Sequence, residues 1–196
     1  MQTLTWEQFL QNGLPLNGKK TSMTVGIFDG VHLGHQMLLR RVVSYNADFI
    51  PVVLTFKDNH KTAISEERDN YKDIQSFNER IEKFKSLGIQ NTIVVDFNED
   101  FKHIPGIDFL KLLLKHGNVG FFAAGSNFRC GCKLDTGAEA IIKFFASHDV
   151  CAEIVSDVCY PLDDSKSSKP ISSSRIRKAI AEGNIEHVEK MLGRRL

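Results

Sequence analysis

The 196-residue chain carries 25 Lys and Arg against 24 Asp and Glu, which gives a formal net charge of +1. This balance excludes a strongly basic nucleic-acid-binding module and an acidic tail protein. No run approaches the roughly 20 apolar residues that a membrane helix needs, and the N-terminal residues lack the basic and apolar regions of a signal peptide. We therefore expect one globular domain over residues 1–196, in the cytoplasm.

Short apolar, β-branched segments alternate with amphipathic helical patterns along the chain. The expected strands are residues 23–28, 50–56, 92–95, 119–124 and 152–155. The expected helices are residues 34–44, 73–87, 108–115, 137–147, 173–181 and 184–191. Strands that are apolar throughout favour a parallel sheet with both faces covered. The pattern therefore predicts an α/β fold with a doubly wound, parallel, five-stranded sheet and helices on both faces.

Two polar, aperiodic segments, residues 57–72 and 163–170, are expected to be loops. In an open α/β sheet, ligands bind beyond the carboxyl ends of the strands, where such loops lie. The simpler alternative for each segment is a solvated connection.

The four cysteines are Cys130, Cys132, Cys151 and Cys159. Only the first two lie close together, as C-x-C, and no second pair completes a tetrahedral zinc site. We interpret all four as core or loop residues and assign no metal ligand.

The first motif, GIFDGVHLGHQ, runs from Gly26 to Gln36, out of the first expected strand and into the first expected helix. His32 and His35 stand three positions apart, so both can face the same side of the helix. A glycine at position 30 allows a tight turn, and Gly34 allows close approach of a ligand to the backbone. Because a helix N-terminus already favours an anion, the two imidazoles predict a phosphate clamp. Half of a metal site is the alternative, but no third ligand follows the helical zinc pattern.

The second motif, ISSSRIR, opens a later expected helix. Its serines are good N-caps, which alone would explain them, but their hydroxyls and the exposed amides also suit phosphate oxygens. Arg177 lies four residues after Ser173, one turn along on the same face, where its guanidinium can engage a phosphate. Arg175 points elsewhere, and we interpret it as a surface charge.

The two motifs together resemble the bacterial FAD synthetases, the FMN adenylyltransferase module of bifunctional riboflavin kinase/FAD synthetases. GIFDGVHLGHQ is similar to the HxGH signature of Rossmann-like adenylyltransferases, and ISSSRIRKAIAEGNIEHVEKMLGR is similar to the family's second signature and the helical pair that follows it. Asn78-Glu79-Arg80 and the segment from Gly125 to Gly131 resemble further landmarks in order. The resemblance covers residues 23 to 194.

Two departures from the family pattern fall where the family accommodates the flavin. The usual Thr-Phe-Glu-Pro-His-Pro is replaced by Thr55-Phe56-Lys57-Asp58-Asn59-His60, and Cys130 replaces an aromatic residue. The chain also stops where the riboflavin kinase barrel of the family would begin, so no kinase activity is expected of it.

The resemblance implies that the protein transfers AMP from ATP, with Mg²⁺, to FMN, and so yields FAD and pyrophosphate. It implies a catalytic role for His32, His35, Ser173 and Arg177. It implies nucleotide binding by Gly26, Phe28, Asp29, Gly34 and Ser174, and flavin binding by Phe56 and Asn127. A turn residue or helix cap is the alternative role for Asp29. The metal would be held by phosphates rather than by a protein cage.

Lys166 and Lys169 lie where they could close over the triphosphate, although solvated loop lysines are the simpler interpretation.

The expected partners are small molecules, with a separate riboflavin kinase supplying FMN, and neither a nucleic acid nor a membrane. Two alternatives remain. One is adenylyl transfer to another phosphate-bearing acceptor, such as a nicotinamide nucleotide or pantetheine phosphate. The other is a non-catalytic paralogue that binds flavin or nucleotide. Nucleic-acid binding is disfavoured, since no basic face or aromatic platform is evident.

Overall fold

The computed structural model describes residues 1–57, 72–161 and 168–195. Its centre is a six-stranded sheet in the order β1-β4-β3-β2-β5-β8, and every neighbouring pair is parallel. The strands are β1 (Gln2–Thr5), β2 (Thr21–Val25), β3 (Ile50–Phe56), β4 (Asn91–Val95), β5 (Val119–Gly125) and β8 (Cys151–Val155). The prediction of a doubly wound parallel α/β sheet is therefore confirmed.

The predicted five strands are all present, but the sheet has a sixth, β1, at one edge. Only Leu4 of its four residues is buried, so the sequence offers no apolar run there. The strand predicted at 23–28 ends at Val25, because the chain leaves the sheet before Phe28, whose backbone lies in the left-handed region (φ 57°).

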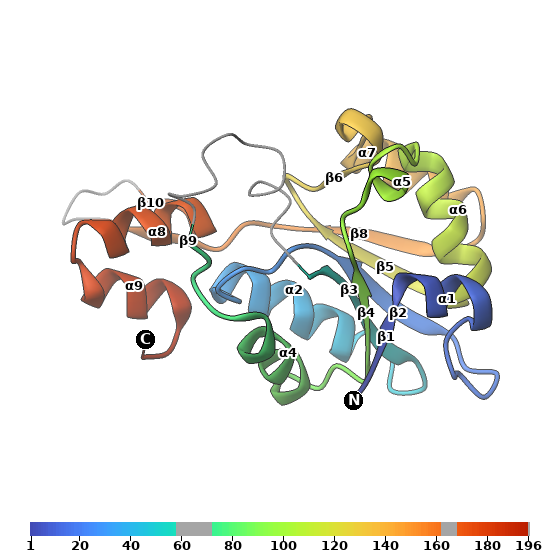
Figure 1. Ribbon diagram of the computed structural model, residues 1–196, viewed down its shortest axis with the longest axis horizontal. Helices are drawn as coiled ribbons and strands as arrows, with labels where there is room; N and C mark the ends of the chain where they lie inside the picture. Colours follow the sequence, from blue (N-terminus) through green and yellow to red (C-terminus); the bar gives the residue numbers. More distant parts are fainter. Residues whose placement is uncertain (58–71, 162–167, 196) are drawn as a thin grey trace.

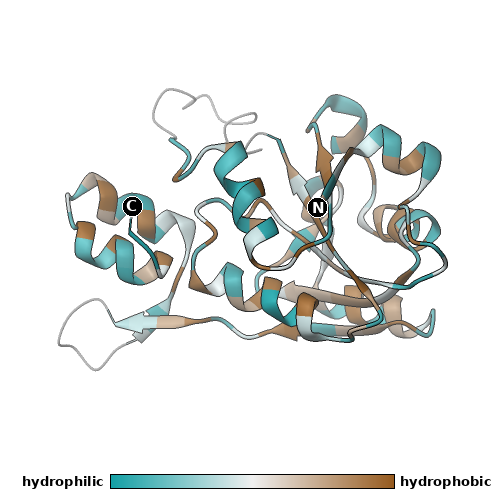
Figure 2. Ribbon diagram, turned by 90° about the horizontal axis from the view of Figure 1, so that it is seen from below, coloured by the Kyte–Doolittle hydropathy of each residue, from teal (hydrophilic) through white to brown (hydrophobic). Residues whose placement is uncertain are grey.

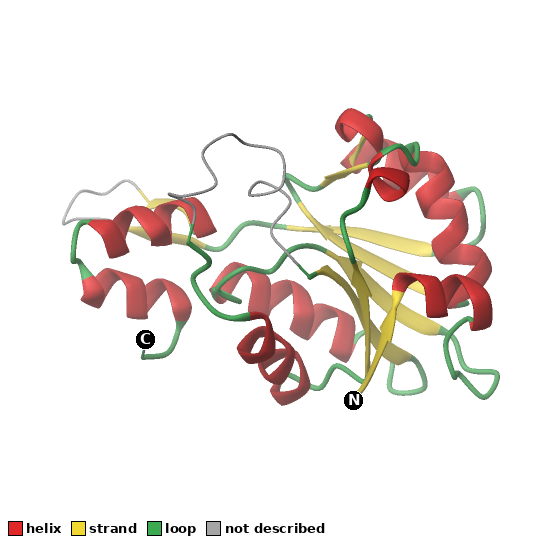
Figure 3. Cartoon of the chain, in the orientation of Figure 1, coloured by secondary structure: helices red, strands yellow, loops and turns green. Residues whose placement is uncertain are grey.

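Helices cover both faces of the sheet, as Figures 1 and 3 show. One face carries α1 (Trp6–Asn12), α6 (Gly106–Gly117) and α7 (Ala138–Ala146), and the other carries α2 (Leu33–Ser44) and α4 (Phe77–Ser86). Successive strand residues point to opposite faces: Val52 and Leu54 join the first core, and Val53 joins the second. Both sides of each central strand are thus buried.

Helix boundaries agree with the predictions to within two residues, except at α4. That helix begins at Phe77 and not at residue 73, because Ser76 is its N-cap. The Ser76 hydroxyl accepts from the Glu79 amide (3.3 Å), and the Glu79 carboxylate accepts from the Ser76 amide (2.8 Å), which closes a capping box. Two short helices were not predicted, α1 and α5 (Glu99–Lys102).

The C-terminal part forms a small unit beyond the end of the sheet (Figure 1). Helices α8 (Ser173–Ala181) and α9 (Ile185–Leu192) pack together through a separate apolar cluster that includes Ile176, Val188 and Met191. Beside them lies an antiparallel pair, β9 (Cys159–Pro161) and β10 (Ser168–Pro170). The predicted loop 163–170 was therefore wrong for residues 168–170. Residues 163–167 of this predicted loop, which include Lys166, lie outside the described residues. The same holds for residues 58–71, which make up most of the other predicted loop.

All four cysteines are free thiols. Cys130 is buried, but Cys151 and Cys159 are exposed positions on strands β8 and β9 rather than core or loop residues. Among the described residues no helix is long and apolar enough to cross a membrane, and the helices in Figure 2 carry hydrophilic as well as hydrophobic residues.

Candidate active site

A cleft of about 520 Å³ lies beyond the carboxyl ends of the strands and reaches the start of α8. The cleft is lined by all the residues to which the sequence assigned a catalytic or binding role, namely Gly26, Phe28, Asp29, His32, Gly34, His35, Phe56, Asn127, Ser173, Ser174 and Arg177. The two motifs, which are far apart in the sequence, therefore meet in one cavity, as the sequence predicted. The structure gives their positions, and their roles stay predictions.

The turn between β2 and α2 is strained. Phe28, Gly30 and Val31 all have positive φ (57°, 80° and 36°), and this conformation is especially unfavourable for a β-branched residue such as Val31. The turn is held by the buried Gln36 side chain, whose amide nitrogen donates to the carbonyls of Val31 (2.9 Å) and Leu192 (2.8 Å). The C-terminal end of the last helix, α9, thus helps to fix the turn that carries the histidines.

The C-terminal Arg194 adds a second contact to the same turn. One guanidinium nitrogen donates to the Gly30 carbonyl (3.0 Å), and another donates to the side-chain oxygen of Gln75 (2.8 Å). Leu192-Gly193-Arg194, which end the C-terminal string that resembles the family, therefore have a structural role, because they tie the end of α9 to the turn between β2 and α2.

The two histidines stack on each other at the start of α2, with ring centroids 3.6 Å apart and an interplanar angle of 19°. His32 is the N-cap residue, and its Nδ1 accepts from the His35 amide (3.3 Å). An accepting Nδ1 places the proton of a neutral imidazole on Nε2. His35 also contacts Phe28 in a T-shaped arrangement, at 5.2 Å between centroids. The pair is thus preorganised before any ligand binds.

Both imidazoles are neutral at pH 7. Burial lowers the pKa of His32 to about 4. Burial also lowers the pKa of His35 well below its usual value, and the proximity of His32 and of the Arg80 guanidinium lowers it further. Neutral imidazoles can donate one hydrogen bond to a phosphate oxygen without having to release a proton. The Nδ1 atom of His35 is buried with no hydrogen-bond partner among the described residues.

Asp29 joins the first motif to the second. Its carboxylate forms an ion pair with the Arg177 guanidinium and accepts from the Ile74 amide (3.0 Å), and its carbonyl accepts from the Ser173 hydroxyl (2.9 Å). Burial raises the pKa of the Asp29 carboxyl, and the Arg177 charge opposes this rise. The sequence suggested nucleotide binding by Asp29, or a turn residue or cap, whereas the structure shows that the side chain connects the two motifs.

Arg80, to which the sequence assigned no role, supports the site from behind without lining the cleft. Its buried guanidinium donates to the carbonyls of Ile27 (2.6 Å), Phe56 (2.7 Å) and Lys57 (3.1 Å). It therefore fixes the ends of β2 and β3 at the cleft. The sequence did contain an indication that Arg80 is buried. Arg80 lies three residues after Phe77 and four before Phe84, and therefore on the apolar face of its helix.

Arg175 is not the surface charge that the sequence suggested. Its guanidinium donates to the carbonyls of Lys169 (2.5 Å), Pro170 (2.6 Å) and Tyr160 (3.2 Å). These bonds attach the β9–β10 pair to α8. Lys169 itself is exposed on β10 and does not line the cleft.

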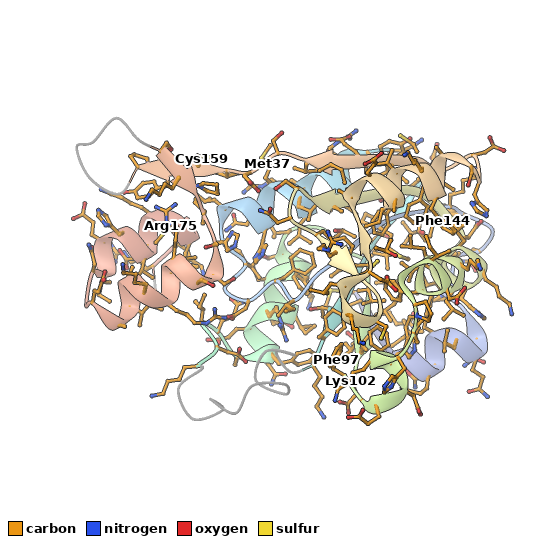
Figure 4. The ribbon with its side chains drawn as sticks, turned by 90° about the horizontal axis from the view of Figure 1, so that it is seen from above. Met37, Phe97, Lys102, Phe144, Cys159 and Arg175 are labelled. Atoms are coloured by element: carbon orange, nitrogen blue, oxygen red, sulfur yellow. The ribbon has the colours of Figure 1, made fainter. Side chains whose placement is uncertain are left out.

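One end of the cleft is aromatic. The rings of Phe56, Phe97 and Phe101 lie 5.8 Å apart, centroid to centroid, in all three pairings. Lys102 places its ammonium 6.0 Å from the Phe97 ring centre (Figure 4). Of these residues the sequence singled out only Phe56. The others follow β4 in a segment without periodicity, so no pattern marked them.

The segment after β5 forms the facing wall of the cleft. Asn127 is exposed there, and the neighbouring Ser126 hydroxyl donates to Asp157 (2.8 Å). Burial raises the pKa of the Cys130 thiol to about 12. Cys130 is therefore a neutral, apolar part of the wall, where the family carries an aromatic residue.

The fold and this cleft define an α/β protein with a doubly wound parallel sheet, in which an HxGH motif opens the helix beside the cleft. More particularly, the chain belongs to the FAD synthetase family, which residues 15–175 match.

Among curated relatives, the chain is 27% identical over 177 residues to a bifunctional riboflavin kinase/FMN adenylyltransferase of Buchnera aphidicola, covering 89% of this chain and 55% of that protein. It is 26% identical to an FAD synthetase of Listeria monocytogenes, covering 87% of this chain and 68% of that protein. The chain spans about half the length of the bifunctional relatives.

A solved structure described as a macrolide-efflux protein from Streptococcus pneumoniae aligns with a TM-score of 0.79 at 30% identity, covering 98% of this chain and 60% of that one. Pantothenate synthetase from Thermus thermophilus aligns with a TM-score of 0.57 at 12% identity, covering 98% of this chain and 81% of that one. The second likeness concerns the fold alone.

Proposed function

We propose that this protein is an FAD synthetase, which transfers AMP from MgATP to FMN and releases FAD and pyrophosphate. The observation that carries the proposal is the Asp29–Arg177 ion pair, because it brings the histidine motif and the serine-arginine motif to one cleft. Family membership supports the same reaction.

The reaction needs no protein base. The FMN phosphate is already an anionic nucleophile at neutral pH, so one of its oxygens attacks the α-phosphorus of ATP in line. The bond from that phosphorus to the bridging oxygen breaks, and pyrophosphate leaves with the electron pair. The enzyme must therefore supply position and charge stabilisation, and fixed neutral imidazoles match that requirement.

His32 and His35 are proposed to donate to the ATP phosphates, with His35 closest to the transition state. The backbone amides at the start of α2 add their dipole to the same anion, and Gly26, Phe28 and Gly34 shape the cradle. A Cβ at Gly34 would lie 3.2 Å from the His32 ring, so the glycine leaves room for the stacked pair.

Ser173, Ser174 and Arg177 are proposed to hold the leaving pyrophosphate. In the described structure the Arg177 guanidinium is paired with the Asp29 carboxylate. A phosphate would take its place or share the arginine, since guanidinium binds both anions through the same planar fork. Asp29 thus presents Arg177 toward the cleft and away from the solvent.

The aromatic end of the cleft, with Phe56 and the unpredicted Phe97 and Phe101, is proposed to take the isoalloxazine ring, and Asn127 to lie near the FMN phosphate. Flat rings pack favourably against aromatic side chains at these spacings.

Mg²⁺ would enter as part of MgATP. Among the described residues no group of three or more His, Cys, Asp or Glu side chains is placed to hold a metal, while Asn127 and Asp157 offer single oxygen ligands to the cleft. This donor set fits a metal held chiefly by phosphates, which would neutralise phosphate charge.

FMN would come from a separate riboflavin kinase, and we place the reaction in the cytoplasm.

The test is to incubate the purified protein with MgATP and FMN and to follow FAD by chromatography and pyrophosphate by a coupled assay. Parallel reactions with nicotinamide mononucleotide and pantetheine phosphate test the other acceptors. FAD formed together with pyrophosphate in equal amounts is the expected result. Pyrophosphate release with another acceptor alone would overturn flavin specificity, and nucleotide binding without turnover would favour a non-catalytic paralogue.

A further inference from the structure

The cleft has fewer available positive charges than its proposed substrates require. A phosphate monoester carries close to two negative charges at pH 7, ATP carries more, and the two histidines are neutral. Of the described residues, three arginines or lysines line the cleft, namely Lys102, Arg129 and Arg177. How each of these cations is already paired therefore decides which can take a new anion.

Two of the three already have carboxylate partners. Lys102 pairs with Glu99 (2.6 Å), and Arg177 pairs with Asp29. Arg129 differs, since its Nε donates only to the backbone carbonyl of Leu134 (2.9 Å), and no described carboxylate lies within ion-pair distance of it. Its positive charge is thus not neutralised by a described partner.

Arg129 is also held in a defined place. It lies on β6 (Arg129–Cys130), which pairs with β7 (Thr136–Gly137), and the Leu134 carbonyl belongs to the intervening 3₁₀ turn, Cys132–Leu134. The bond through Nε fixes one edge of the guanidinium and leaves the two terminal nitrogens for a ligand. This geometry suits the two oxygens of a phosphate group.

The position of β6 ties Arg129 to the flavin end of the cleft. The Cys132 amide donates to the Ile104 carbonyl (2.9 Å), and the Gly106 amide donates to Asp135 (3.0 Å). The segment around Ile104 directly follows the one that carries Phe97 and Phe101. An anion on Arg129 would therefore belong to the molecule whose ring lies at the aromatic end.

We propose that Arg129 binds the phosphate monoester of FMN and lets the protein distinguish FMN from unphosphorylated riboflavin. The inference rests on the proposed function, because it concerns the acceptor substrate of that reaction. Arg129 thereby has a role in binding and specificity, whereas the phosphates of ATP, including the α-phosphate that is transferred, are bound by the histidines and Arg177.

The test compares the binding of FMN and riboflavin, followed by quenching of flavin fluorescence, in the wild type, Arg129→Gln and Arg129→Lys. A charge-assisted contact contributes about 1.5–3 kcal/mol, so Arg129→Gln should lower the affinity for FMN by about 10- to 100-fold. The affinity for riboflavin and the KM for ATP should not change. Arg129→Lys, which keeps the charge, should recover part of the preference for FMN.

Lys133→Gln is the matched control, because Lys133 is an exposed cation in the same turn that does not line the cleft, and it should behave as the wild type. An Arg129→Gln protein that keeps the wild-type ratio of FMN to riboflavin affinity would overturn the inference. Equal losses for both flavins would overturn it too, since they indicate a structural effect. Wild-type FAD synthesis, measured in parallel, separates these outcomes from failure of the proposed function itself.

Discussion

The Arg177 guanidinium meets the Asp29 carboxylate across 148 positions of sequence, at the point where the start of α8 approaches the turn before α2. Only 16% of the Arg177 side chain and 4% of that of Asp29 are exposed. Because this pair is largely shielded from solvent, it fixes the relative position of the two motifs more firmly than a surface ion pair would. The proposed site depends on that position.

The first prediction concerns the groups that would stabilise the transition state. Arg177→Ala and His35→Ala should each lower kcat for FAD formation by about 10²–10³, the usual effect of removing one such donor. Lys178→Ala and Met37→Ala are matched controls, because each changes an exposed neighbour on the same helix. Steady-state kinetics on variants with a native circular dichroism spectrum would check this, and wild-type turnover in Arg177→Ala and His35→Ala would contradict the assignment.

Most of the fold could be predicted because the central strands are buried on both faces and therefore read as continuous apolar runs. The edge strand β1 was not predicted, because only Leu4 is buried in it and a single buried residue gives no apolar run in the sequence. The position of the histidine motif in the site was also predictable, because strand ends and helix starts meet at one side of a parallel sheet. The position of the serine-arginine motif was expected only from the family resemblance, since α8 lies beyond the sheet.

The partners of the site residues were much less predictable. That Asp29 pairs with Arg177, or that Gln36 reaches Leu192, depends on the packing of α8 and α9, which no local pattern encodes. Phe97 and Phe101 lie just after β4, Phe101 in the one-turn helix α5, and their grouping with Phe56 arises only when β3 and β4 are paired.

The second prediction concerns stability at acid pH. His32 has a pKa of about 4 in the folded protein against about 6.5 when unfolded, so the unfolded chain binds more protons between these values. Stability should therefore fall as the pH decreases from about 6.5 to 4, by about 3 kcal/mol from this group alone. Urea denaturation across this range measures it.

His32→Asn is the informative comparison, because Asn is a good N-cap and has no titrating imidazole. Its stability should decline less steeply between pH 6.5 and 4 than that of the wild type. Parallel declines in the two proteins would show that His32 does not titrate in this way.

The third prediction concerns the strained turn. Gln36→Leu removes both hydrogen bonds from the buried amide and leaves the carbonyls of Val31 and Leu192 without their partner. The free energy of unfolding should fall by about 2–3 kcal/mol, and kcat should fall as well, because the turn carries His32. Met37→Leu, at an exposed neighbouring position, should change neither quantity. A Gln36→Leu protein as active and stable as the wild type would show that other contacts hold the turn.

The last prediction separates the ring of the flavin from its phosphate. Phe97→Ala removes an aromatic side chain from the cleft but no charge, so it should weaken FMN and riboflavin binding by the same factor. An aromatic pair contributes about 0.5–1.5 kcal/mol in addition to the hydrophobic effect of the area it buries. Its loss should therefore lower the affinity for each flavin by about two- to tenfold or more. Ile107→Ala, a change at an exposed apolar position outside the cleft, is the control and should leave both affinities unchanged. Fluorescence titration with the two flavins measures the effect. A selective loss of FMN binding in Phe97→Ala would mean that the phosphate, and not the ring, lies at the aromatic end.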